Sequence, residues 1–449
     1  MDKITDDTTN NELGGHVNKK SFRLSFSSIT KSLGPGLVTG AADDDPSGVA
    51  TYSQAGARFG LGLLWMAIFQ YPLMTVIQEM CARIGLITGE GLALVIKKKY
   101  SNKIVLPLAS LLLISNTINI GADIGAMGAA AKLIFPDLSF ILATLLFTAF
   151  VLIVQIFVPY RTYVKVLKYL TISLFAYVIT AFIVGGNFTE IAIASFVPHI
   201  EFTQEFALLF VAMLGTTISP YLFFWQTSEE VEEEVKKKQI KEFNVGTPHP
   251  TKKEIKLMRA DVAVGMFFSQ LIMWSIVLTT AGSLHSHGIM DIKTSEQVAK
   301  ALEPAVKSFP YSGQISKIIF ALGIIGTGLL AVPVLAGSSA YALSDTFGWK
   351  QGLYKKFKQA RAFYLLIAAS TTVGLWISFT NIDPIKALVY AAVINGVTAV
   401  PILITVLRIA NDRKILGDNV NGRLSNIIGV ITVAIMGVSV VVMFLTFVY

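Results

Sequence analysis

Three consecutive carboxylates inside an apolar segment are the residues of this sequence best suited to do chemistry. They are Asp43, Asp44 and Asp45, and Pro46 follows them directly. A carboxylate at membrane depth costs on the order of 3 kcal/mol, so this triplet must face protein, water or a cation and not lipid. Pro46 removes a backbone donor and Gly48 adds backbone freedom, so we expect the helix to break here.

A broken helix frees carbonyl groups and helix ends that can bind an ion. Successive helical residues point about 100° apart, so three adjacent carboxylates cannot converge on one point. Asp45, which lies at the break, is therefore the strongest ligand candidate. Alternatively, Asp45 caps the half-helix that begins at Pro46, since aspartate is a good N-cap. Asp43 and Asp44 could equally line a polar vestibule.

A second apolar segment has an interruption of the same form. Thr216 and Thr217 precede Ser219 and Pro220, and Tyr221 follows. A single proline kink is common in membrane helices. Two broken helices, in corresponding positions of two five-helix halves, are typical of inverted-repeat transporters. The repeat is visible in hydropathy only, because the residues of the two halves do not match.

Other polar residues also fall inside apolar segments. Asp123 could be a proton-path carboxylate or a hydrogen-bonded packing residue, and Asn395 could supply an amide oxygen or simply pack. Glu79 and Arg83 stand four residues apart, which favours an ion pair. The acidic run at 229–234 precedes three lysines, and we interpret it as the solvated end of a helix.

The remaining soft ligands are few. His285 and His287 lie in a predicted loop without a third ligand, which does not favour a metal site. No histidine falls inside an apolar segment. Cys81, the single cysteine, lies in an apolar run and is interpreted as a small buried side chain.

Composition places most of the chain in a membrane. Of its 449 residues, 53% are hydrophobic and 15% are charged, whereas soluble domains are about 25% charged. Mean hydropathy is +0.62. A spanning helix needs about 20 mostly apolar residues, and eleven segments qualify. They are 32–57, 60–87, 104–133, 139–158, 164–186, 205–228, 258–284, 314–343, 362–380, 385–409 and 426–448.

These spans predict an all-α polytopic membrane protein. Residues 1–30 are polar, mixed in charge and lack the apolar core of a signal peptide, so we expect a disordered cytoplasmic tail. The stretch 285–313 is expected to be an external loop with a short surface helix from Ser295 to Ala305. The expected boundaries are a transporter domain at 31–449, repeat one at about 31–186, repeat two at about 205–410 and an added helix at about 426–448.

Charge predicts the orientation. The net charge of +8 comes largely from lysines and arginines in alternate short loops, and the stretch 187–204 has neither residue. This is the positive-inside pattern of a membrane protein and not the continuous basic stripe of a nucleic-acid-binding protein. It predicts a multi-pass protein, expected in the plasma membrane, with a cytoplasmic N-terminus and an external C-terminus. The sequence contains no Walker motif, so an ATP-driven pump is not expected. It also contains no catalytic constellation, so an enzyme is not expected.

Several motifs resemble those of the Nramp family of proton-coupled divalent metal transporters. Gly34-Pro35-Gly36, Asp45-Pro46 and Ala50-Thr51-x-x-Gln54-Ala55-Gly56-Ala57 have the family's spacing. So do Ala82-x-x-Gly85-x-x-Thr88-Gly89 and Ile415-Leu416-Gly417-x-x-Val420-Asn421-x-Arg423-Leu424. The resemblance runs from about Gly34 to beyond Arg423. It implies a LeuT-like fold of five-plus-five inverted repeats with an eleventh transmembrane helix.

The chain also departs from the family's pattern. The signature Asp-Pro-Gly-Asn is here Asp45-Pro46-Ser47-Gly48, so the asparagine ligand is lost. The family's Met-Pro-His is here Ser219-Pro220-Tyr221, so the thioether and the imidazole are lost as well. Asp123 resembles the family's acidic position on the third helix. The resemblance therefore carries over Asp45 as a ligand, the Thr216 carbonyl as a second ligand and Asp123 as a proton-path carboxylate.

The candidate site that results contains only oxygen ligands. The expected metal ligands are Asp45, Thr216 and Ser219, with Asp44 and Asn395 as further candidates. Asp123 and Tyr221 are assigned to a proton path or to support behind the ligands. The helix breaks are expected at Pro46, Gly48 and Pro220. Oxygen ligands suit Mg²⁺, Mn²⁺ or Ca²⁺, whereas soft ligands favour later transition metals.

The first hypothesis is therefore an alternating-access secondary transporter of divalent cations, with Mg²⁺ or Mn²⁺ ahead of Fe²⁺ and Zn²⁺. Weak or absent proton coupling is expected, because no histidine lies in a span. The lipid bilayer is the expected surrounding, with no bound cofactor and no obligate protein partner. One alternative is a LeuT-like carrier of a small organic solute such as an amino acid, in which Asp45 binds the amine or a coupling ion. Another is a non-transporting membrane sensor.

Overall fold

The structure is a computed structural model that describes residues 34–158, 162, 172–184, 186–380 and 382–447. The predicted tail at 1–30 lies outside these residues, as does the beginning of the predicted fifth span. Within the described ranges the secondary structure is helical and contains no β-strand, which confirms the all-α prediction.

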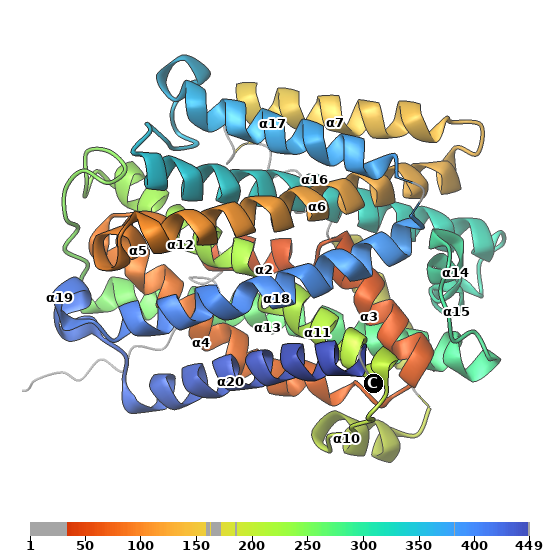
Figure 1. The fold of residues 1–449 in the computed structure, drawn as a ribbon. Coiled ribbons are helices and arrows are strands. Elements are labelled where there is room, and N and C mark those ends of the chain that lie inside the picture. Colours follow the sequence, from red (N-terminus) through yellow and green to blue (C-terminus); the bar gives the residue numbers. More distant parts are fainter. Residues whose placement is uncertain (1–33, 159–161, 163–171, 185, 381, 448–449) are drawn as a thin grey trace, which may run out of the picture. The chain divides into compact units, whose positions relative to one another are not determined.

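Each predicted span corresponds to a helix or to a pair of half-helices (Figure 1). The spans, in chain order, are α2 (Pro35–Asp43) with α3 (Pro46–Phe59), α4 (Trp65–Thr88), α6 (Asn102–Ile134), α7 (Phe140–Phe157), α9 (Phe175–Val184), α11 (Gln204–Thr217) with α12 (Pro220–Lys236), α13 (Lys252–Ser283), α16 (Ser312–Phe347), α17 (Arg361–Ser378), α18 (Pro384–Ala410) and α20 (Arg423–Thr446). The shorter helices are α5 (Leu92–Tyr100), α10 (Phe188–Phe196), α14 (Ser295–Lys300), α15 (Glu303–Val306) and α19 (Arg413–Leu416).

Eight helices of the described chain are long and apolar enough to cross a bilayer, counting α11 and α12 as one. The other three spans fall short for local reasons. The first is divided between α2 and α3, α4 carries polar residues along its length, and α9 has its preceding residues outside the described part. Their packing against the long helices places them in the same bundle.

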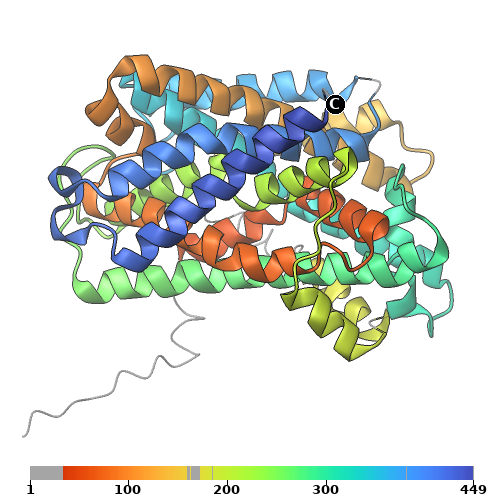
Figure 2. The ribbon, with the colours of Figure 1, turned by 60° about the horizontal axis from the view of Figure 1, so that its bottom comes forward.

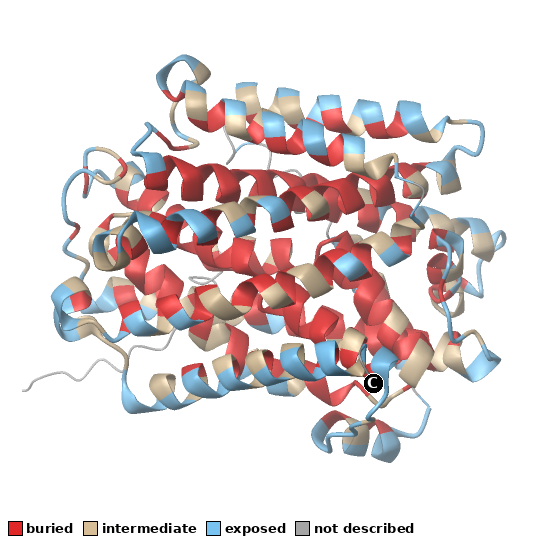
Figure 3. Cartoon of the chain, viewed as in Figure 1, coloured by how far each residue is buried: buried red, intermediate tan, exposed pale blue. Residues whose placement is uncertain are grey.

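The helices form a buried centre with lipid-compatible helices around it. α6 and α16 pack along each other, and α17 and α7 lie side by side outside them (Figure 1). α20 lies on another outer side, against α11, α18 and α4 (Figure 2). α11, α12 and α16 are mostly buried, whereas α7, α17 and α20 carry exposed residues along their outward faces (Figure 3). Those exposed residues are mostly apolar, as expected of surfaces that meet lipid.

The half-helix α2 is held along its length by the continuous helix α13. Their backbones touch at Gly40, where a Cβ atom would lie 2.3 Å from the carbonyl oxygen of Gly265. Asp261 of α13 accepts hydrogen bonds from the N–H groups of Gly34 (3.2 Å) and Gly36 (2.7 Å), so it caps the start of α2. A carboxylate at that end also complements the helix dipole.

The acidic run at 229–234 is not solvated, so that prediction is wrong. Glu229, Glu230, Glu232 and Glu234 are all buried in the second half of α12. α12 packs against α4 and α16 there, and the chain after α16 covers it, since the N–H of Leu353 donates to Glu232 at 2.7 Å. A charged run is buried here because segments distant in sequence fold over it.

The expected surface helix at 295–305 is also different in the structure. It is two short helices, α14 and α15, and Val298 and Leu302 are buried against the bundle. In the same loop, His285 Nδ1 lies 2.9 Å from the carbonyl oxygen of Ala57, at the end of α3. The loop therefore packs against the helices of the bundle.

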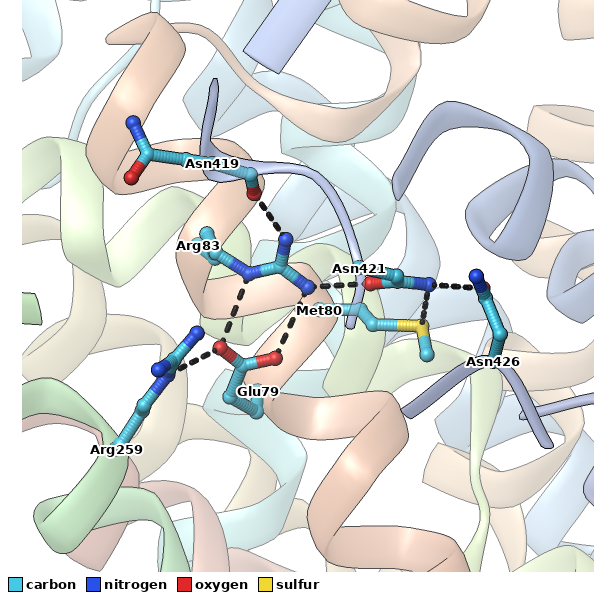
Figure 4. A network of polar contacts seen from close by, with 7 residues as sticks. All are labelled: Glu79, Met80, Arg83, Arg259, Asn419, Asn421 and Asn426. Carbon is cyan, nitrogen blue, oxygen red and sulfur yellow. Dashed lines mark hydrogen bonds and ion pairs between the residues drawn. The ribbon is translucent and has the colours of Figure 1, made fainter. Parts of the chain in front are cut away.

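The predicted ion pair between Glu79 and Arg83 is confirmed and belongs to a larger network (Figure 4). Arg83 contacts both carboxylate oxygens of Glu79 at 3.0 Å, and Arg259 of α13 reaches the same carboxylate at 2.8 Å. Arg83 also donates to the carbonyl of Asn419 and to Asn421 Oδ1, the latter at 2.5 Å. The network therefore joins α4, α13 and the segment before α20.

We expect Arg83→Met to reduce the free energy of unfolding by about 3 kcal/mol, because breaking a buried ion pair leaves its partners uncompensated. The Arg83 side chain is 1% exposed, whereas that of Arg259 is 54% exposed. Arg259→Met is the matched control and should cost less than about 1 kcal/mol. Thermal unfolding in detergent measures both, and equal melting temperatures for the two variants would contradict the prediction.

Candidate functional site

The first break is made by two residues that leave the helical conformation. Asp44 has φ −83° and ψ 51°, Asp45 is extended at φ −68° and ψ 171°, and Pro46 then begins α3. Asp45 caps α3, because its Oδ1 accepts the N–H of Gly48 and the hydroxyl of Ser47, both at 2.7 Å. The alternative in which Asp45 is an N-cap is thus present in the structure. Since Oδ1 already accepts two hydrogen bonds, Oδ2 is the oxygen with a lone pair left for an ion.

The second break has the same backbone form. Ile218 leaves the helix at φ −104° and ψ 58°, Ser219 is extended at φ −80° and ψ 134°, and Pro220 begins α12. In both breaks two non-helical residues precede a proline in the first helical position, where its missing N–H costs nothing. The second break differs because Ser219 makes no side-chain cap to α12.

The two breaks face each other. A Cβ atom on Gly48 would lie 3.2 Å from Thr216 Oγ1 and 3.3 Å from the carbonyl oxygen of Asp43. The hydroxyls of Tyr52 and Thr217 lie 3.2 Å apart and join α3 to α11. Asp45 and Thr216, which the sequence assigns to one site, are therefore brought together around the first turn of α3.

Hydroxyl groups cover the carbonyls that the breaks set free. Ser219 Oγ lies 2.6 Å from the carbonyl oxygen of Gly215 and 2.7 Å from that of Thr216, and donates to them. Tyr221 donates from its hydroxyl to the carbonyl oxygen of Ala42 at 3.1 Å, joining α12 to the last turn of α2. In this conformation Ser219 and Tyr221 thus satisfy main-chain acceptors, while Thr216 Oγ1 has no partner among the described residues.

Asp43 and Asp44 turn toward α13. The hydroxyl of Ser269 donates to Asp43 Oδ2 and lies 3.5 Å from Asp44 Oδ1. Asp43 Oδ1 is buried and has no hydrogen-bond partner in the described part of the chain. Asp44 is thus placed beside Asp43 and Ser269, and no hydrogen bond joins it to Asp45.

Asn119 of α6 connects the breaks to Asp123. Its Nδ2 donates to Asp45 Oδ2 at 3.0 Å. Asp123 lies four residues further along α6, on the same face. It is fully buried, and neither carboxylate oxygen has a hydrogen-bond partner within the described ranges. Asp123 therefore lies one helical turn from the group that holds Asp45.

Asn395 is placed near the second break but faces another helix. It precedes Gly396, whose backbone packs against Gly215 at the end of α11. Its Oδ1 accepts the hydroxyl of Ser115 of α6 at 2.5 Å, and its Nδ2 has no partner in the described chain. Asn395 could serve an ion only after turning away from Ser115.

The buried charges of the described chain are mostly negative. Among the described residues, nine buried carboxylates stand against one buried guanidinium, that of Arg83, and no lysine or histidine is buried. The carboxylates are Asp43, Asp44, Asp45, Asp123, Glu229, Glu230, Glu232, Glu234 and Asp345. No three His, Cys, Asp or Glu side chains of the described chain converge as a metal-binding group. A cation at the breaks would therefore need carbonyl, hydroxyl or water oxygens beside Asp45.

Three further residues at this site are not among those predicted from the sequence. Ser269, Asn119 and Ala42 contact Asp43, Asp45 and Tyr221 respectively. Asn119 could have been found, because it stands four residues from Asp123 in an apolar helix. Ser269 is one of several hydroxyl residues in its segment, and Ala42 contributes only its carbonyl, which no side chain signals.

Comparison with known proteins supplies the identity of the fold. The Nramp family model, described as natural resistance-associated macrophage protein-like, matches residues 36–446. A protein of Pectobacterium carotovorum named divalent metal cation transporter MntH is 23% identical, over 94% of this chain and 96% of that protein. A crystal structure of the Eremococcus coleocola manganese transporter matches 94% of this chain and 86% of that one, with a TM-score of 0.72 and 14% identity. The structure of Mhp1, a nucleobase-cation-symport-1 family transporter, matches 92% of this chain and 92% of that one, with a TM-score of 0.52 and 12% identity.

The structural matches confirm a LeuT-like arrangement of two five-helix repeats, to which α20 adds the eleventh helix. The two breaks lie in the first helix of each repeat, as the sequence predicted. Because the family model spans residues from α2 to the end of α20, the chain is a multi-pass membrane protein that belongs to the Nramp family of transporters.

Proposed function

We propose that this chain is a secondary transporter of divalent metal cations that works by alternating access. The observation that carries the proposal is the excess of buried carboxylates: three of the nine, Asp43, Asp44 and Asp45, lie at the first break, and Asp123 lies on α6 one helical turn from Asn119, which donates to Asp45. Buried negative charge without a partner costs several kcal/mol per group, so a cation is the natural ligand. The related proteins are named divalent metal cation transporter and manganese transporter, which supports divalent metals as the substrate.

The ligand set favours hard cations. Asp45 would provide carboxylate oxygen, and Thr216 would provide its hydroxyl and its carbonyl oxygen. Ser219 brings a hydroxyl where the family carries a thioether. Mg²⁺ and Mn²⁺ are therefore favoured over Fe²⁺ and Zn²⁺. Asp44 would add long-range attraction, and Asn395 would join the ligands after turning from Ser115.

The proposed orientation follows from charge. α5, α12 and α19 end in or contain lysines at one end of the bundle, including Lys97, Lys236 and Lys414. We place this lysine-rich end in the cytoplasm of a plasma-membrane protein, with the C-terminus outside. The lipid bilayer is the only partner besides the ion that the proposal requires.

Asp45→Asn tests the site with the least structural damage. Asparagine is as good an N-cap as aspartate, so the bond to the Gly48 N–H should persist. We expect Asp45→Asn and Asp45→Ala both to lose uptake of Mn²⁺ and Mg²⁺ into proteoliposomes, with the folded fraction of Asp45→Asn unchanged. Glu190→Ala, at an exposed position of α10, is the control. Wild-type uptake in folded Asp45→Asn would remove Asp45 from the site, and amino-acid uptake would instead favour an organic-solute carrier.

Ser219 should set metal preference. Ser219→Ala frees the carbonyls of Gly215 and Thr216 from a hydrogen bond worth about 1 kcal/mol. The same change removes one proposed hydroxyl ligand, so the two effects oppose each other and the affinity for Mg²⁺ should change by less than about fivefold. Ser219→Met adds a thioether and should raise the ratio of Cd²⁺ to Mg²⁺ affinity at least about tenfold. Calorimetry on the three proteins measures the ratio, and an unchanged ratio in Ser219→Met would show that this side chain does not face the ion.

Proton coupling should be weak or absent. In the described chain the histidines lie in loops or in the turn at 285–287, outside the long helices. Tyr221 stands at the family's histidine position and donates its hydroxyl hydrogen to the carbonyl oxygen of Ala42. The ordinary pKa of tyrosine is about 10, so tyrosine carries protons poorly at physiological pH. A pH-sensitive dye inside proteoliposomes measures the coupling during metal uptake. Acidification that matches the metal flux and disappears in Asp123→Asn would establish symport instead.

A further inference from the structure

A line of buried polar side chains follows α12 from the second break toward the lysine-rich end. Gln226, Glu230 and Glu234 stand four residues apart, so they lie on one side of the helix. Their exposed fractions are 0%, 4% and 0%. We call these three residues the acidic stripe.

The stripe continues from the proposed ion site. Residues seven and eleven positions after Ser219 return to within about 20° of its direction on a helix that turns 100° per residue. Those positions are Gln226 and Glu230. With a rise of about 1.5 Å per residue, Glu230 lies about 16 Å and Glu234 about 22 Å along the axis from Ser219.

Members of the stripe lack the partners that buried carboxylates need. Gln226 Nε2 donates to Glu230 Oε1 at 2.9 Å, which turns the amide toward the carboxylate. Gln226 Oε1 and both oxygens of Glu234 are buried without a hydrogen-bond partner in the described chain. Within those same residues no lysine or arginine forms an ion pair with Glu230 or Glu234.

Acidic residues beside the stripe are treated differently. Glu232 accepts the hydroxyl of Tyr341 at 2.6 Å and the N–H of Leu353 at 2.7 Å. Glu233 pairs with Lys236 at 3.2 Å. Glu232 and Glu233 thus have hydrogen-bond or ion-pair donors, whereas Glu234 has no hydrogen-bond donor in the described chain. A general lack of polar groups in this region therefore does not explain why Glu234 has no donor.

The spacing of the two carboxylates suits one cation. Side chains four residues apart on a helix have Cβ atoms about 5–6 Å apart, so two carboxylates can bind one ion with oxygen distances of about 2.0–2.6 Å. The free amide oxygen of Gln226 is a third ligand of the same hard type. A divalent cation would also neutralise both carboxylates, which removes the cost of burying them.

We propose that the acidic stripe is a second binding site for a divalent cation, between the breaks and the cytoplasm. The site rests on the proposed function, since it gives the transported ion an intermediate station after it leaves Asp45. Glu230 and Glu234 are its charged ligands, and Gln226 contributes its amide oxygen. Neither site needs a soft ligand, so both take the same ions.

The test counts Mn²⁺ ions bound to the full-length purified protein, using the electron paramagnetic resonance signal of free Mn²⁺. Wild type should bind two ions. Asp45→Asn should keep one, and adding Glu230→Gln or Glu234→Gln should weaken that remaining site at least tenfold. Glu233→Gln in the Asp45→Asn background is the matched control, because it removes a carboxylate of the same run that already has a lysine partner. It should leave the count at one.

The double variants Asp45→Asn/Glu230→Gln and Asp45→Asn/Glu234→Gln each remove one carboxylate of the acidic stripe, so the site is tested twice. Gel filtration measures the folded fraction of each variant, which separates misfolding from loss of the site. Mn²⁺ binding in both double variants equal to that of Asp45→Asn would overturn the second site, and so would Asp45→Asn that binds no ion. Uptake measured in parallel separates the two proposals. A wild type that transports no metal overturns the proposed function, whereas the ion count of Asp45→Asn still decides whether the stripe binds a cation.

Discussion

The constraint on which this structure depends is the burial of negative charge where no water or lipid can solvate it. Asp45 meets the constraint with three donors: the N–H of Gly48, the hydroxyl of Ser47 and the amide of Asn119. The break frees the N–H of Gly48, because an uninterrupted helix would have no free N–H to offer, whereas Asn119 reaches Asp45 from the continuous helix α6. The rest of the bundle holds these donors in place.

Much of the fold could be predicted from the sequence because its signals are local. Apolar runs of sufficient length predicted the spans. Pro46 and Pro220, together with the small and polar residues beside them, predicted both breaks, because a proline removes a backbone donor and crowds the preceding turn. Proline alone is not sufficient, since α4, α6, α16 and α18 each continue through one. Partners were harder to predict. Asp261 caps α2 from more than two hundred residues away, and no periodicity encodes that pairing. The error at 229–234 has the same origin, because the groups that cover Glu232 come from α16 and the segment after it.

Two substitutions within the family's pattern change how the breaks are satisfied. Ser219 and Tyr221 use their hydroxyl hydrogens on the carbonyls of Gly215, Thr216 and Ala42. A thioether and a neutral imidazole nitrogen would leave those carbonyls with weaker donors or with none. A chain with these hydroxyls therefore satisfies its main chain without an ion, and an arriving ion must compete with a hydrogen bond. Such competition favours ions that gain most from oxygen ligands.

The attachments of α2 indicate which parts would move together in the proposed transport cycle. α2 is bound to α13 at both ends, through Asp261 at its start and Ser269 near its end, and the close approach at Gly40 holds its middle. Its described side-chain link to α12 is the single bond from Tyr221 to Ala42. Separating α2 from α12 would therefore break about one side-chain hydrogen bond, a cost of roughly 1 kcal/mol, whereas separating α2 from α13 would break both hydrogen bonds to Asp261 and leave a charged cap without its partners. The less costly motion therefore separates α2 from α12.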